Sequence, residues 1–116
     1  MISTKKLLTL ILKKLKITSL YNTKLSAPST QSDYAYDFVT ALENYNIVLM
    51  RCECGNLRQL LVFCRLFGDT PMYISDNNGT YVRGGYIVDW TNNRIGVRWV
   101  NGNNTNVFVQ QVYGVL

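Results

Sequence analysis

The chain of 116 residues contains no histidine and only three cysteines. Histidine is the most common general base and the most common zinc ligand, so its absence excludes Ser-His-Asp and Cys-His mechanisms. Three is an odd number, which argues against a complete disulfide framework, and Cys52 and Cys54 are separated by one residue where redox and zinc motifs have two. We therefore expect the cysteines to be packing residues that bind no metal.

Sequence signatures of catalysis are missing too. The seven acidic residues form no paired constellation, and the sequence has no glycine-rich phosphate loop or nucleophile elbow. The sequence thus predicts a protein that is not an enzyme and that uses no cofactor.

Long hydrophobic runs are also absent. Lysines precede the apolar stretch Leu7–Leu12, as in a signal peptide, but this stretch is too short for a secretory signal and far too short to span a bilayer. We expect no signal peptide and no transmembrane segment, and we expect the leader to stay in the mature protein.

The charges are unevenly distributed. All six lysines lie in residues 1–25, which contain no acid, whereas the six arginines lie in the rest of the chain among the seven acids. The net charge of +5 therefore comes from the leader, and the body is close to neutral. We predict a basic helix over residues 1–20, a linker over 21–33 and one compact domain over 34–116.

Residues 3–17 have the pattern of an amphipathic helix, which Ser3 or Thr4 can cap. Its apolar stripe supplies the candidate residues for attachment or oligomerisation, Leu8, Ile11, Leu12 and Leu15. The pattern fits three arrangements: packing on the body or on a partner, self-association in a short bundle, or binding to a membrane surface through the basic face.

From Tyr34 onward, apolar residues alternate between turns rich in glycine and asparagine, which is typical of an all-β domain. We predict a mainly β fold, an antiparallel β-sandwich of jelly-roll-like type preceded by the amphipathic helix. The clearest hairpin turns at Gly55-Asn56. This turn predicts the pairs Cys54–Leu57, Cys52–Gln59, Met50–Leu61 and Val48–Phe63 on one face, and Glu53–Arg58, Arg51–Leu60, Leu49–Val62 and Ile47–Cys64 on the other.

Two consequences follow from this hairpin. Cys52 and Cys54 share one face and Cys64 lies on the opposite one, so the three cannot converge on a metal. Both faces are apolar away from the turn, so we expect the hairpin to be covered on two sides, either inside a sandwich or where subunits meet.

A second hairpin is predicted around Asn92-Asn93, with Trp90 opposite Ile95, Val88 opposite Val97 and Tyr86 opposite Trp99. Both tryptophans then face the core, and the charged residues face outward, with Asp89 near Arg94 or Arg98. The candidate receptor-binding residues are Asp89, Asn92, Asn93, Arg94, Arg98 and Asn103. Because the tryptophans and arginines are on opposite faces, we expect no nucleic-acid binding. Carbohydrate binding by the asparagine-rich tips and the tyrosines fits the composition.

The leader "MISTKKLLTLILKKLK", the hairpin "RGGYIVDWTNNRIGVRWV" and the terminal "VQQVYGVL" together resemble small tail-associated proteins of phages and prophages from gut Firmicutes. The resemblance covers most of the chain and implies a virion component, a homotrimer whose leader attaches to other virion proteins or bundles with its copies. It further implies that the β-domain faces outward as an adhesin for host-surface carbohydrate.

Two alternatives stay open. One is a free carbohydrate-binding module, for which removal of residues 1–25 would leave a soluble monomer. The other is a protein held on a membrane or nucleic acid by its lysine-rich leader, which would show steep salt dependence.

Overall fold

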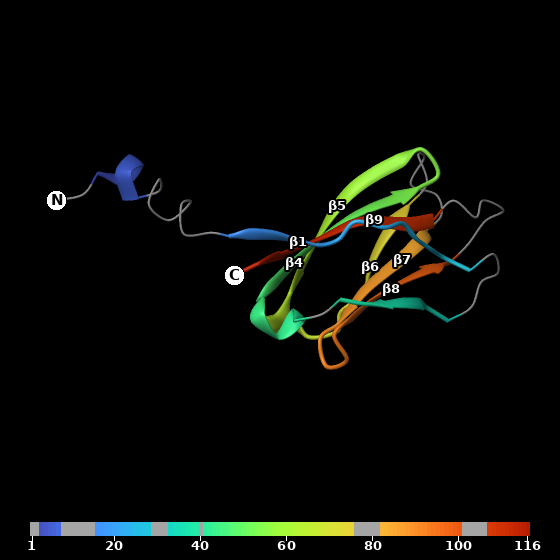
Figure 1. The fold of residues 1–116 in the computed structure, drawn as a ribbon. Coiled ribbons are helices and arrows are strands. Elements are labelled where there is room, and N and C mark those ends of the chain that lie inside the picture. Colours follow the sequence, from blue (N-terminus) through green and yellow to red (C-terminus); the bar gives the residue numbers. More distant parts are fainter. Residues whose placement is uncertain (1–2, 8–15, 29–32, 40, 76–81, 101–106) are drawn as a thin grey trace.

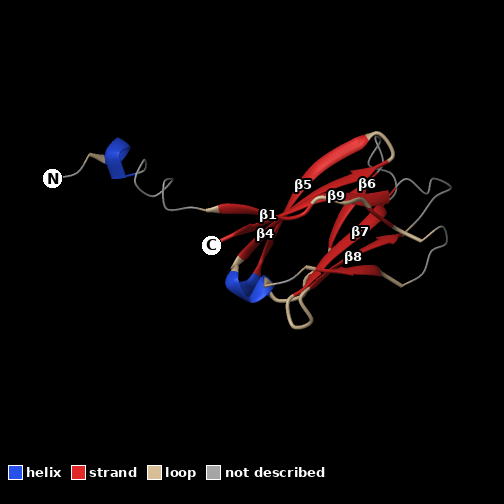
Figure 2. Cartoon of the chain, in the orientation of Figure 1, coloured by secondary structure: helices blue, strands red, loops and turns tan. Residues whose placement is uncertain are grey.

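The computed structural model describes residues 3–7, 16–28, 33–39, 41–75, 82–100 and 107–116. These residues form a mainly β fold of two antiparallel sheets (Figures 1 and 2). The strands are β1 (Ile17–Tyr21), β2 (Leu25–Ser26), β3 (Ala35–Phe38), β4 (Ile47–Cys54), β5 (Leu57–Cys64), β6 (Met72–Ser75), β7 (Val82–Asp89), β8 (Arg94–Trp99) and β9 (Val107–Val115), with short 3-10 helices η1 (Leu42–Asn44) and η2 (Arg65–Phe67).

The strand order decides which segments become neighbours. The first sheet runs β1-β9-β4-β5, with β2 also paired to β9, and the second runs β3-β8-β7-β6. Hairpins between consecutive strands stay within one sheet, whereas the early strands β1 and β3 pair with the late strands β9 and β8. β5 lies at one edge of the first sheet, and β3 and β6 lie at the edges of the second.

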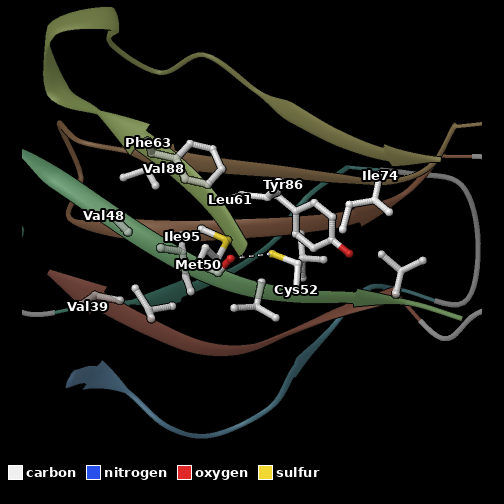
Figure 3. Close-up of a cluster of buried hydrophobic side chains, with 14 of the residues drawn as sticks. Val39, Val48, Met50, Cys52, Leu61, Phe63, Ile74, Tyr86, Val88 and Ile95 are labelled. Carbon is white, nitrogen blue, oxygen red and sulfur yellow. Dashed lines mark hydrogen bonds between the residues drawn. The ribbon is translucent and has the colours of Figure 1, made fainter. Parts of the chain in front are cut away.

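Both sheets contribute one face to a single core, part of which is drawn in Figure 3. The buried side chains include Val48, Met50 and Cys52 from β4, Leu61 and Phe63 from β5, Ile74 from β6, Tyr86 and Val88 from β7, Ile95 and Val97 from β8, and Val107, Val109 and Val112 from β9. Burying a side chain of this size contributes roughly 1.5–3 kcal/mol, so this cluster is the main source of stability.

The β4–β5 hairpin has the predicted register at all eight pairs, from Ile47 opposite Cys64 to Cys54 opposite Leu57. Gly55 has the positive φ of 61° that a two-residue turn of this kind requires. The face with Val48 and Phe63 belongs to the core of the chain and is not left exposed for contact with another subunit. The opposite face is only partly covered, since Leu60 and Val62 are exposed.

The cysteines lie on the faces that this register predicts. Cys52 and Cys54 are buried on the core face, and Cys64 is partly buried on the other. Burial raises the pKa of the Cys52 thiol, whose Sγ lies 3.6 Å from the Met50 carbonyl oxygen. Among the described residues, no group of three metal-ligating side chains comes together.

The β7–β8 hairpin has the predicted faces but not the predicted register. Tyr86 lies opposite Val97 and Val88 opposite Ile95, which is a shift of two residues from the expected pairs. The loop is therefore four residues long, Trp90–Asn93. The shift is even, so every side chain keeps its face: Trp90 is buried, and Trp99 packs partly buried against the core.

The N-terminal part differs most from the expectation. Ser3 caps the described turn Thr4–Leu7, since its Oγ accepts a hydrogen bond from Lys6 N at 3.2 Å. Residues 17–20, expected in the helical segment, instead belong to strand β1, and β2 lies in the expected linker. β9 pairs with β4 on one side, and its other side offers backbone hydrogen-bond partners that β1 and β2 take up as extended segments. Leu8, Ile11, Leu12 and Leu15 lie outside the described residues.

Candidate binding face on the second sheet

Three tyrosines and two arginines gather on the outer face of the second sheet, which we call the tyrosine-arginine face: Tyr34, Tyr36, Tyr73, Arg94 and Arg98. The sheet order places them side by side, because antiparallel partners share a face. Tyr36 of β3 lies opposite Gly96 of β8, next to both arginines on that strand. On the other side, Gly85 of β7 lies between Arg98 and Tyr73.

Two glycines make room for these rings. A Cβ at Gly96 would lie 2.7 Å from a Tyr36 ring carbon, closer than real Cβ contacts come. A Cβ at Gly85 would lie 3.2 Å from both a Tyr73 ring carbon and Cγ of Arg98. The tyrosines of the edge strands therefore lie inward across glycines of the central strands and form one continuous surface.

The arginines stack on the rings. The guanidinium carbon of Arg94 lies 3.7 Å from the centre of the Tyr36 ring, and that of Arg98 lies 5.2 Å from the centre of the Tyr34 ring. The two ring centres are themselves 5.8 Å apart. Each distance is within the range of favourable cation-π and aromatic contacts, so the side chains hold one another in place.

Asp89, one of the predicted site residues, is enclosed by its neighbours. It points to the outer face as expected, but it is buried, with 8% of its surface exposed. Its carboxylate accepts hydrogen bonds from Asn92 Nδ2 at 2.9 Å and Arg94 Nε at 2.8 Å. Burial alone would raise the pKa of Asp89, but the hydrogen bonds from Asn92 and Arg94 outweigh it and lower this pKa. Asp89 therefore organises the turn, and its carboxylate is paired within the protein.

The remaining predicted residues fall in different places. Asn92 is exposed at the tip of the turn, and Asn93 is partly buried in a left-handed conformation with φ 51°. Arg94 and Arg98 belong to the tyrosine-arginine face. Asn103 lies outside the described residues.

The tyrosines of this face were not among the predicted site residues. The expected separation holds between the tryptophans and the arginines of β8, although Arg65 of η2 lies 4.6 Å from the centre of the Trp90 ring. It is wrong for Tyr34, Tyr36 and Tyr73, which lie beside Arg94 and Arg98. The signal in the sequence is the spacing Tyr34-x-Tyr36 together with Gly96 inside one predicted strand and Gly85 directly before another. It can be read only when β3 is known to lie beside β8.

A second surface is exposed and apolar. It consists of Leu60 and Val62 on the outer side of β5 and Leu66 and Phe67 of η2, with exposed fractions of 54%, 51%, 84% and 71%. We call it the β5 apolar edge. A pocket beside it is lined by Val62, Phe63, Cys64, Phe67, Gly68, Thr70 and Met72.

No known protein family, curated protein or solved structure matches this chain. Within the described part of the chain, no helix has the length and apolar character needed to cross a membrane.

Proposed function

We propose that this protein is a non-enzymatic receptor-binding protein that holds host-surface carbohydrate against the tyrosine-arginine face. The observation that carries the proposal is the packing of Tyr36 and Tyr73 across Gly96 and Gly85 beside two arginines. Sugar rings present C–H groups that pack on aromatic surfaces and hydroxyl oxygens that accept hydrogen bonds from guanidinium groups. Tyr73 and Tyr36 are 45% and 37% exposed, so a ligand can reach both.

Carbohydrate is favoured over nucleic acid as the partner. Sequence-independent binding of single strands requires aromatic faces on which bases can stack. The Arg94 guanidinium covers one face of the Tyr36 ring and Arg98 lies over the Tyr34 ring, which leaves Tyr73 as the tyrosine of this face with no arginine of the described chain stacked on it. One such ring beside arginine donors suits a single sugar with its hydroxyl groups better than a run of stacked bases.

The proposal extends to the setting of the protein: a homotrimeric adhesin of a phage tail, attached to other virion proteins through the leader. The resemblance of the leader, the β7–β8 hairpin and the C-terminal strand to tail-associated proteins supports this. The β5 apolar edge supports self-association, because monomeric proteins rarely expose such contiguous apolar surface. Three copies would also raise avidity for a weakly bound sugar by roughly 10²–10⁴-fold.

The two sheets are proposed to form a sandwich of jelly-roll-like type. Side chains of both sheets meet in one core, and early strands pair with late ones, β1 with β9 and β3 with β8. Such nested pairing is the basis of Greek-key sandwiches.

A free carbohydrate-binding module is the second candidate. One chain supplies every residue of the tyrosine-arginine face, so a monomer would bind sugar without a neighbouring copy. The mass of the protein in solution separates this candidate from the trimeric adhesin.

The test is a glycan-binding screen with the full chain, followed by titration calorimetry on the best ligand. We expect Tyr73→Ala to weaken binding about tenfold or more, since a base stacked on one aromatic ring contributes roughly 1–3 kcal/mol and a sugar ring on Tyr73 would make a contact of the same kind. Arg58→Ala is the matched control, because Arg58 is an exposed arginine on the first sheet. Full-strength binding by Tyr73→Ala, or no glycan bound by the wild type, overturns the proposal.

A further inference from the structure

We propose that the ligand is an anionic saccharide, and that its carboxylate or phosphate group binds to Arg98 between Tyr34 and Tyr73. This inference rests on the function proposed above and specifies the chemical class of the ligand. It is carried by the state of the Arg98 side chain, which differs from that of Arg51, Arg58, Arg65 and Arg94.

Four other arginines have polar partners within the protein. Arg94 contacts Asp89 at 2.8 Å and Arg58 contacts Glu53 at 3.2 Å, so both charges are neutralised. Arg51 donates to Gln111 Oε1 at 3.3 Å, and Arg65 donates to the Tyr45 carbonyl at 3.0 Å. These contacts account for their positions without a ligand.

Arg98 has no such partner among the residues that the structure describes. Its Nε is buried and makes no hydrogen bond, and no carboxylate of the described chain pairs with its guanidinium. A buried donor that has lost its water is unfavourable until an acceptor reaches it. The planar guanidinium matches the two oxygens of a carboxylate or phosphate, which distinguishes it from a donor suited to a single hydroxyl.

The surroundings of Arg98 hold it in position for an anion. Its guanidinium lies over the Tyr34 ring, and its stem packs on Gly85 beside Tyr73. Burial, followed by the neighbouring Tyr73, raises the pKa of Tyr34 although Arg98 opposes the shift, so Tyr34 stays neutral and places no negative charge beside the guanidinium. The local charge is positive as well, because Asp89, the acid on this side of β7, is already paired with Arg94.

The saccharide part of the ligand would lie against Tyr73. This residue is on the edge strand β6 and is 45% exposed, directly beside the Arg98 stem over Gly85. An anionic group on Arg98 and a sugar ring on Tyr73 therefore occupy adjacent positions of one surface. A neutral sugar would fill only the second of these positions.

The experiment compares three polymers by titration calorimetry with the full chain: a polyuronate, a polyol phosphate and an uncharged glucan. We expect at least one anionic polymer to bind and the uncharged glucan to bind at least tenfold more weakly. Arg98→Ala should lower the affinity for the anionic polymer at least tenfold, and Arg98→Lys should restore part of it, since the charge returns without the planar pair of donors. Arg58→Ala should leave the affinity unchanged. The preferred polymer identifies carboxylate or phosphate as the bound group.

The outcomes separate this inference from the proposed function. If a neutral glycan binds as tightly as the anionic ones and Tyr73→Ala weakens it while Arg98→Ala does not, the anionic assignment is wrong and glycan binding stands. If no saccharide binds, both fail. Because Arg98→Ala also removes packing on Gly85, Arg98→Gln serves as a second variant, and unfolding curves check that each variant is folded.

Discussion

Asp89 shows how a single buried carboxylate determines the shape of a hairpin. It accepts hydrogen bonds from the side chain and the backbone of Asn92 and from Arg94, all within five residues of sequence. These bonds hold Trp90–Asn93 as a four-residue loop in place of the expected two-residue one. The neighbouring Asp69 strengthens the arrangement by accepting a hydrogen bond from Trp90 N at 3.0 Å.

The lowered pKa of Asp89 predicts an acid-sensitive stability. A carboxyl group with a lower pKa in the folded state contributes stability above its unfolded pKa of about 3.9 and loses it as the pH falls through the folded value. We expect Asp89→Asn to lower the free energy of unfolding by roughly 1–3 kcal/mol at neutral pH and to lose less stability than the wild type between about pH 5 and 2. Chemical denaturation across this range measures both effects.

The control for this prediction is Glu53→Gln. Glu53 pairs with Arg58, whose side chain is 70% exposed, so solvent weakens this ion pair. A pH dependence that changes equally in the two variants would contradict the role assigned to Asp89.

Tyr21 predicts the opposite behaviour at alkaline pH. Burial, followed by a hydrogen bond with Asp37, raises the pKa of Tyr21 to about 12. The stability that this contributes is present below the unfolded pKa of about 10 and is lost as the pH rises to about 12. We expect Tyr21→Phe to flatten the decrease in unfolding free energy over this interval, measured by denaturation at a series of alkaline pH values. An unchanged slope in the variant would show that the tyrosine is not responsible.

The faces of individual residues could largely be predicted from the sequence, whereas their neighbours could not. Alternation places Trp90, Cys52 and Cys54 correctly on the core side, because it depends only on local geometry. The burial of Asp89 depends on the four-residue loop Trp90–Asn93, whose length the two-residue turn pattern did not predict. The contact between Tyr36 and Arg94 depends on β3 lying beside β8, and residues so distant in sequence carry no local signal of that pairing.

At the scale of elements, β1 and β2 show where a pattern of apolar residues misleads. Lysines and leucines continue the helical pattern to residue 17, yet Ile17–Tyr21 pairs with β9. The β-branched Ile17 and Thr18 fit a strand at least as well as a helix. The β4–β5 hairpin was predicted in every pair because a two-residue turn fixes its register, and a tertiary contact is not required.

Truncation tests the place of β1 and β2 in the fold. Leu20, Tyr21, Leu25 and Ala27 pack against the core, so removal of residues 1–30 exposes apolar surface and leaves the backbone of β9 without partners on one side. We expect this truncation to lower the free energy of unfolding by several kcal/mol, a large share of the typical 5–15 kcal/mol. Removal of residues 1–15 should leave it nearly unchanged. Denaturation followed by circular dichroism compares the two, and equal stabilities would contradict the assignment of β1 and β2 to the core structure.

At the scale of the whole molecule, each of the two sheets buries one face in the shared core, and its other face points outward. On the second sheet, the outward side carries the side chains of the tyrosine-arginine face. The outer side of the first sheet at β5 is left apolar and exposed at Leu60 and Val62. From its apolar residues, the β4–β5 hairpin was predicted to be buried on both faces. Within the described residues, the core face is buried, and Leu60 and Val62 on the other face are exposed.

For the proposed trimer, we expect copies of the chain to meet at β5. It is an eight-residue edge strand that pairs with β4 without a bulge, and neither lysine nor proline interrupts it. Lysine, proline and bulges are the devices by which monomeric proteins prevent edge strands from associating. Its outer side chains continue into the exposed Leu66 and Phe67 of η2, so backbone and side chains offer one apolar interface.

We expect the full chain to have three times the monomer mass by light scattering, and the double variant Leu60→Asp with Val62→Asp to have the monomer mass. Charges on this surface prevent apolar contact between copies, and because both residues are exposed, the fold should stay intact, as circular dichroism would show. Val82→Asp, which places a charge at an exposed residue of the second sheet, should keep the trimer mass. A wild-type chain of monomer mass would rule out the trimeric adhesin and favour the free carbohydrate-binding module, whereas a trimer that survives the double variant would place the interface on another surface.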